Sequence, residues 1–112
     1  RVHEAGGYVS HAHPFREASY IPHFEPDAYG LDAVEVFNGR HMDPSFDEKA
    51  RAFAKRCHLP GTAGADAHNT LHIYDGAMRF FYPVITFDEI FAAIRKGDYE
   101  IVPHLNERAT GF

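Results

Sequence analysis

The 112-residue sequence has little of several features that mark particular classes of protein. Its single cysteine, Cys57, excludes a disulfide within the chain and is typical of a reducing compartment, so we expect a cytoplasmic protein. No apolar run approaches the 18 residues that a membrane span requires. The formal net charge of −5 disfavours binding to nucleic acid, which needs a basic surface. Neither a membrane nor a long nucleic acid is therefore an expected partner.

Histidine, by contrast, is abundant, with nine residues, and the sequence is organised around the first closely spaced pair. Residues 8–13 are predicted to form a strand, in which His11 and His13 share one face because side chains alternate along a strand. Pro14 should end this strand, because it lacks an N–H and favours an extended residue before it. Both imidazoles would then lie at the carboxyl edge of a sheet, where open α/β sheets bind ligands, with Arg16 just beyond.

Two further predicted strands also carry polar residues at or near their ends. Residues 33–37 form an apolar strand that ends at Asn38-Gly39, but Glu35 interrupts it. A buried carboxylate is costly unless it is paired or bound to metal, so either Glu35 has a partner or this strand is an edge or half-exposed strand with Glu35 in water. Residues 62–68 form the third strand, in which Asp66 and His68 face the same way.

Two amphipathic helices are predicted between and after these strands. The first begins near Asp43-Pro44, with Asp43 as the cap or with a capping box from Ser45 to Glu48. Its apolar stripe consists of Phe46, Ala50, Phe53, Ala54 and Cys57. The second begins at a capping box, residues 86–89, and ends at Gly97. Residues 78–85 are expected to be extended, and residues 99–102 to form a last strand.

This alternation of strands and helices, without a hairpin signal, predicts an α/β fold with a mainly parallel sheet and crossover helices. The carboxyl ends of the three early strands would then lie along one edge. Their histidine and carboxylate side chains would converge there. Mixed nitrogen and oxygen ligands suit zinc, manganese or iron rather than calcium.

Three segments carry a resemblance to a known family: residues 7–16 (GYVSHAHPFR), 34–39 (VEVFNG) and 59–68 (LPGTAGADAH). In this order and spacing they resemble the PHP (polymerase and histidinol phosphatase) family, in particular its stand-alone metal-dependent phosphoesterases. The resemblance extends to residues 90–97 (IFAAIRKG) and implies the carboxyl half of a distorted (β/α)7 barrel.

The resemblance also implies a phosphate-ester hydrolase with up to three divalent metal ions, Mn, Zn or Fe. It makes His13, Asp66 and His68 the expected metal ligands. Arg16 is expected to contact phosphate, so that Arg16, Asp66 and His68 form the catalytic set. The remaining candidates would line the pocket or orient ligands: His11, Glu35, Asn38, Arg40 and His41.

The departure from the family is that its amino-terminal half, with a His-x-His motif, is absent from these residues. Residues 1–112 are therefore expected to be a partial domain that is inactive alone and that pairs as a homodimer or with the missing half. The expected substrate is a small phosphorylated molecule, such as a nucleotide, a sugar phosphate or an oligonucleotide end. Two alternatives stay open: a non-catalytic metal-binding or assembly module derived from this family, and a plain α/β domain with incidental histidines.

Overall fold

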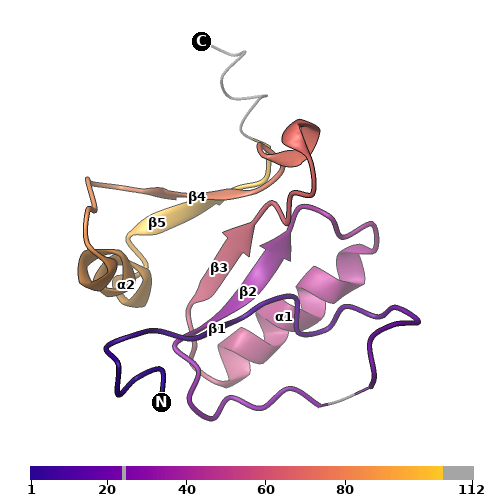
Figure 1. The fold of residues 1–112 in the computed structure, drawn as a ribbon, viewed down its shortest axis with the longest axis horizontal. Helices are drawn as coiled ribbons and strands as arrows, with labels where there is room; N and C mark the ends of the chain where they lie inside the picture. The colour runs from indigo at the N-terminus through magenta and orange to yellow at the C-terminus, as the bar shows by residue number, and fades with distance from the viewer. Residues whose placement is uncertain (24, 105–112) are drawn as a thin grey trace.

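A parallel three-stranded sheet forms the centre of the protein in the computed structural model, which describes residues 1–23 and 25–104 (Figure 1). The strands are β1 (Ser10–His11), β2 (Ala33–Asn38) and β3 (Gly61–Gly64), in the spatial order β1-β2-β3. Ser10 pairs with Ala33, and Val34 pairs with Gly61, so all three strands run in one direction. The predicted convergence of their carboxyl ends at one edge is therefore confirmed for these three strands.

Helix α1 (Pro44–Arg56) covers one face of β2 and forms the main core with it (Figure 1). Its residues Ala50, Phe53 and Ala54 are buried against Val34 and Val36 of the strand. A Cβ atom at Gly61 would lie 2.5 Å from the Val36 side chain, so β3 can approach β2 this closely only with glycine there.

The start of α1 follows from its local sequence. Asp43 is the N-cap, and its carboxylate accepts a hydrogen bond from the Ser45 N–H at 2.9 Å. Pro44 occupies the first helical position, where its missing N–H costs nothing. Of the two caps that the sequence allowed, the structure has the Asp43-Pro44 one.

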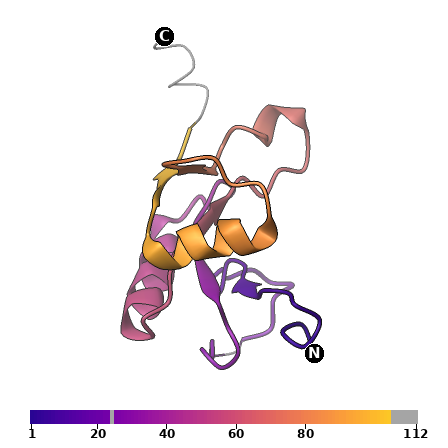
Figure 2. The ribbon, with the colours of Figure 1, turned by 90° about the vertical axis from the view of Figure 1, so that its left-hand side faces the viewer.

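A second, smaller sheet is antiparallel and pairs β4 (Ala77–Phe80) with β5 (Tyr99–Val102). Helix α2 (Phe87–Lys96) connects these strands, capped by Thr86 and ended by Gly97 at φ +75° as predicted. α2 lies on the side of the three-stranded sheet away from α1 (Figures 1 and 2). The expectation of a mainly parallel sheet thus holds for β1-β2-β3 but is wrong for this pair, which α2 returns in the opposite direction.

The connection between β3 and β4 carries a short 3-10 helix, η1 (Thr70–His72), which the sequence analysis did not predict. The two sheets are joined where the Tyr99 hydroxyl donates to the carbonyl of Gly61 at 2.5 Å. Within the described residues neither sheet closes into a barrel. None of the helices described is long and apolar enough to cross a membrane.

Two of the predicted strands are shorter than expected, which corrects the argument from strand faces. β1 consists of Ser10 and His11 only, and β3 ends at Gly64. His13 (φ +31°) and Asp66 (φ +51°) have left-handed backbone conformations, which no strand residue adopts. His11 and His13, and likewise Asp66 and His68, therefore do not share a strand face. They lie on loops that follow the strands.

Candidate functional site

Glu35 has partners inside the protein rather than water alone. Its Oε2 accepts the backbone N–H of His13 at 2.7 Å and the side-chain amide of Asn38 at 3.1 Å. β2 is the central strand of its sheet, so the edge-strand explanation of Glu35 is wrong. The His13 N–H is directed to this carboxylate, which is a physical reason why β1 stops before His13. Glu35 thus fixes the loop that carries His13.

Asp66 belongs to the same polar network from the side of β3. Its Oδ2 accepts the Arg16 guanidinium at 2.6 Å and the Asn38 amide at 3.2 Å. The Asp66 side chain is 25% exposed and that of Arg16 15%. The hydrogen bond from Arg16, with a smaller contribution from Asn38, lowers the pKa of the Asp66 carboxyl despite the opposing effect of burial. Asp66 is therefore an anion at neutral pH.

Asn38 connects these two carboxylates. It is 2% exposed at the end of β2, and one amide nitrogen donates to both Glu35 and Asp66. Its carbonyl oxygen accepts the backbone N–H of Arg40 at 2.8 Å. Asn38 therefore holds two acidic side chains and the start of the β2–α1 loop in one arrangement.

The left-handed backbone at His13 and Asp66 falls within this network. Non-glycine residues in this region cost about 1–3 kcal/mol each, and such strain persists only where the surroundings enforce it. Here the Glu35 carboxylate holds the His13 N–H, and Arg16 and Asn38 hold the Asp66 side chain. Strain that a polar network maintains is typical of functional sites.

The other two candidate histidines differ in exposure. His68 is exposed, and its Nδ1 bonds to the carbonyl oxygen of Asp66 at 2.8 Å, so Nδ1 carries the proton and Nε2 presents a lone pair when the ring is neutral. His11 is half-buried, and burial, with a smaller effect of His13, lowers the pKa of its imidazole. A neutral His11 beside His13 fits a supporting role.

Arg40 and His41 lie on the loop between β2 and α1. Arg40 donates to the Asp75 carboxylate, and its Nε has no partner among the described residues. His41 Nδ1 lies 2.7 Å from Oδ1 of Asp47 on α1. The imidazole of His41 faces that of His13 edge-on, with 6.4 Å between ring centroids. The loop thus adds a third imidazole to the neighbourhood of His13.

Asp47 and Asp75 are site residues that the sequence analysis missed. A signal for Asp47 was available, because it lies three and seven residues before Ala50 and Ala54 and so falls on the apolar stripe of α1. A buried acid on such a stripe needs a partner. Asp75 gave no comparable signal, since it lies in a polar loop after η1 and reaches Arg40 only through the tertiary fold.

The fit of this site to divalent metal ions is partial. His68 and His41 each hold Nδ1 against an oxygen atom, which is how metal-binding histidines are commonly oriented. One oxygen of Asp66, in contrast, is engaged by Arg16 and Asn38. Among the described residues, no three His, Cys, Asp or Glu side chains form a group that could hold a metal ion. The donors suit the metals expected from the sequence, but the described residues do not assemble a complete ligand set.

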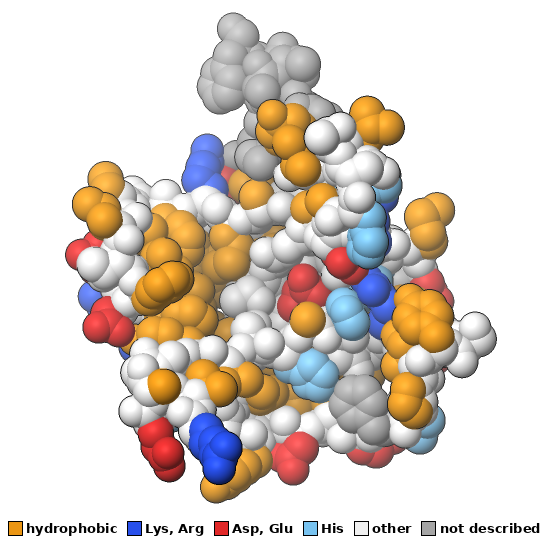
Figure 3. All heavy atoms as spheres, viewed as in Figure 1, with side chains coloured by type: hydrophobic (Ala, Val, Ile, Leu, Met, Phe, Trp, Pro, Cys, Tyr) orange, Lys and Arg blue, Asp and Glu red, His pale blue; other side chains and the backbone are white. Residues whose placement is uncertain are grey.

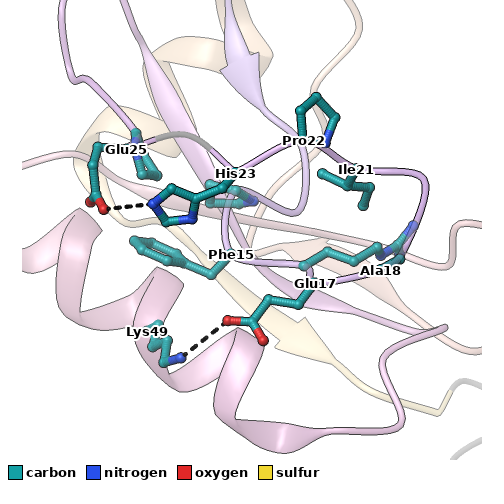
Figure 4. A pocket seen from close by; sticks show the side chains of 11 residues that line it. Phe15, Glu17, Ala18, Ile21, Pro22, His23, Glu25 and Lys49 are labelled. Atoms are coloured by element: carbon teal, nitrogen blue, oxygen red, sulfur yellow. Dashed lines mark ion pairs between the residues drawn. The ribbon is translucent and has the colours of Figure 1, made fainter.

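A cavity of about 360 Å³ lies next to Arg16, between the loop of residues 14–26 and α1 (Figure 4). Its wall is partly apolar, with Phe15, Ile21 and Pro22 among its lining residues. Lys49 lies at the same cavity and pairs with Glu17 at 3.9 Å. On the face shown in Figure 3, histidine, acidic and basic side chains gather in one area. A small ligand could therefore contact both the cavity and the network through Arg16.

A protein-family model described as PHP-associated matches residues 44–99, half of the chain. The matched range runs from the start of α1 to the first residue of β5 and contains Asp66 and His68. His13, Arg16 and Glu35 precede it. No curated protein and no solved structure matched the chain.

Proposed function

The chain belongs to the PHP-associated family, and from that membership we propose that it provides part of the active site of a metal-dependent phosphoesterase. The observation that carries this proposal is the network at the ends of β2 and β3. There Asp66 is bound by Arg16 and is linked through Asn38 to Glu35 and the His13 backbone. A cation, two carboxylates and neighbouring imidazoles at one sheet edge are groups that phosphate-ester hydrolysis uses.

His13, Asp66 and His68 are the residues that would hold the metal ions, manganese, zinc or iron. Bound divalent ions supply Lewis acidity toward phosphoryl oxygens and make bound water a stronger nucleophile. The structure supports His68 in this role through its Nδ1 bond to the Asp66 carbonyl, which directs the Nε2 lone pair outward. It supports Asp66 through its low pKa, because an ionised carboxylate is the form that binds metal.

Arg16 binds the phosphate group in this proposal. A guanidinium matches phosphate in shape and charge and can form two parallel hydrogen bonds with it. Arg16 is mostly buried, is held by Asp66 at 2.6 Å and borders the cavity. Asp66 thereby positions the cation. The rest of the substrate would extend into the cavity.

The substrate class is a small phosphorylated molecule. The cavity of about 360 Å³ lies at the lower end of the range for small-molecule sites. Its lining combines the apolar Phe15 and Ile21 with the cations Arg16 and Lys49, which suits a phosphate ester with a partly apolar leaving group. Nucleotides, sugar phosphates and oligonucleotide ends all meet this description.

The test measures phosphate release from p-nitrophenyl phosphate by the longest gene product that contains this chain, with Mn²⁺ or Zn²⁺ added. Hydrolysis should depend on the metal, and both His13→Ala and Asp66→Asn should lower kcat at least 100-fold. His58→Asn is the control, because His58 is exposed beyond the other end of the sheet and asparagine tolerates its φ of +55°. Hydrolysis that survives loss of both His13 and Asp66 would contradict the proposal.

A second candidate function is a non-catalytic metal-binding or assembly module of the same family. The absence of a three-ligand group among the described residues favours it. This candidate predicts that metal binds to the gene product while phosphate release stays at the level of the solvent reaction. The same assay, combined with elemental analysis for bound metal, separates the two functions.

A further inference from the structure

His41 is a buried imidazole with one nitrogen engaged and the other without a partner. Its side chain is 3% exposed, and Asp47, whose side chain is 11% exposed, lies 2.7 Å from Nδ1. A carboxylate oxygen accepts hydrogen bonds, so Nδ1 carries the proton of a neutral ring and Nε2 carries the lone pair. Within residues 1–23 and 25–104, Nε2 contacts no hydrogen-bond partner.

An unpartnered buried nitrogen needs an explanation, because nearly all buried polar atoms have partners. The ring is also held from two sides. The Phe46 ring packs edge-on against it, with 5.3 Å between centroids, and the His13 ring lies at 6.4 Å. Asp47 is fixed on α1 between residues that pack in the core. The protein therefore orients the His41 ring firmly and yet leaves its Nε2 atom unused.

We propose that His41, positioned by Asp47, is a metal ligand that binds a divalent transition-metal ion together with His13. A ligating histidine usually gives its other N–H to a carboxylate or carbonyl, and the Asp47–His41 pair has this arrangement. Imidazole pairs suit zinc and related ions. Two imidazoles on one zinc ion, with zinc–nitrogen bonds of about 2.0–2.1 Å, place their centroids about 5–6 Å apart. The observed 6.4 Å requires only a small reorientation of one ring.

Two protein ligands leave positions on the ion open for water or a phosphate oxygen. This agrees with the lack of a three-residue group among the described residues. It also gives a function to Asp47, which would otherwise be a buried acid on the apolar stripe of α1. The inference deepens the proposed function by adding His41 to its metal site, but metal affinity tests it without any activity measurement.

Isothermal titration of the 112-residue chain with ZnCl₂ is the experiment. His41→Gln should weaken the zinc site that involves His13 at least tenfold. Asp47→Asn keeps the side-chain shape but removes the charge that orients the ring, and it should weaken binding about 10- to 100-fold. His58→Asn, an exposed histidine replaced on the same chain, should bind zinc as the wild type does. Circular dichroism of each variant establishes that it is folded.

A second measurement uses only the wild-type chain, so it does not depend on the folding of a variant. Nitrogen-15 NMR of the histidine side chains should show His41 with its proton on Nδ1 before zinc and a shifted Nε2 resonance at zinc saturation. An unchanged His41 Nε2 resonance, equal zinc affinity of His41→Gln and wild type, or no zinc binding by the wild type would each overturn the inference. Phosphate release by the gene product is unaffected by the first two of these results, so the proposed function would fail or stand separately.

Discussion

Replacing Asn38 with aspartate tests whether the network between Glu35 and Asp66 depends on a neutral donor. The two side chains have nearly the same shape, so the change is almost purely electrical. In the wild type one amide nitrogen donates to both carboxylates, at 3.1 and 3.2 Å. In Asn38→Asp a third carboxylate oxygen would take the place of that nitrogen, at a position that is 2% exposed.

The expected loss of stability follows from these contacts. A hydrogen bond to a charged group contributes about 1.5–3 kcal/mol, and two are lost, which sets a loss of about 3 kcal/mol or more. Repulsion among three carboxylates adds to it. For a domain of about this size, 1 kcal/mol corresponds to a shift in Tm of about 4 °C or more, so Tm should fall by at least about 10 °C at pH 7.

Thermal and urea unfolding, followed by circular dichroism, measure this effect at pH 7 and pH 4. The penalty should be smaller at pH 4, because one of the three carboxylates can then be protonated at little cost. Asn69→Asp is the matched control. Asn69 is exposed and accepts the Leu71 N–H at 2.9 Å, a bond that aspartate also accepts, so its Tm should change by less than about 3 °C. A Tm for Asn38→Asp within 3 °C of the wild type would refute the reasoning.

Three further predictions concern pH, activity and assembly. Because Arg16 lowers the pKa of Asp66, the ionised pair stabilises the fold above about pH 4 and is lost as the pH falls through that lowered pKa; urea unfolding should therefore show Arg16→Gln less stable than wild type at pH 7 and closer to it at pH 3. The 112-residue chain alone should release phosphate from p-nitrophenyl phosphate very slowly or not at all, because too few ligands are assembled, and robust metal-dependent turnover would contradict this. The short edge strand β1 has its one described partner in β2, so we expect the chain to form a homodimer or to pair with a missing half, and light scattering that shows a clean monomer at low micromolar concentration, with a cooperative melt, would count against it.

Local sequence signals were sufficient for the helices and for the main sheet. The Asp43-Pro44 start and the Gly97 end required only the chemistry of capping and of left-handed glycine. The alternation of strand and helix correctly placed the ends of β1, β2 and β3 at one edge. These features depend on residues within a few positions of one another, which is the range over which a sequence pattern carries information.

The sequence also singled out His13, Glu35, Asn38 and Asp66, but it could not determine how they meet. Alternation along a strand was the wrong rule for His13 and Asp66, because contacts with Glu35, Arg16 and Asn38 hold their backbones in left-handed conformations. The pairing of His41 with Asp47 joins a loop to a helix face, and that of Arg40 with Asp75 joins two loops.

The sequence by itself therefore determined the elements, the edge at which polar residues gather and the family to which they point. Only the tertiary structure decided which carboxylate each donor reaches, that β4 and β5 pair antiparallel, and that the His41 imidazole is buried with one nitrogen unused. The physical reason is that capping and side-chain periodicity act between near neighbours in the chain. Hydrogen bonds to a buried carboxylate, in contrast, depend on segments that are brought together only when the chain folds.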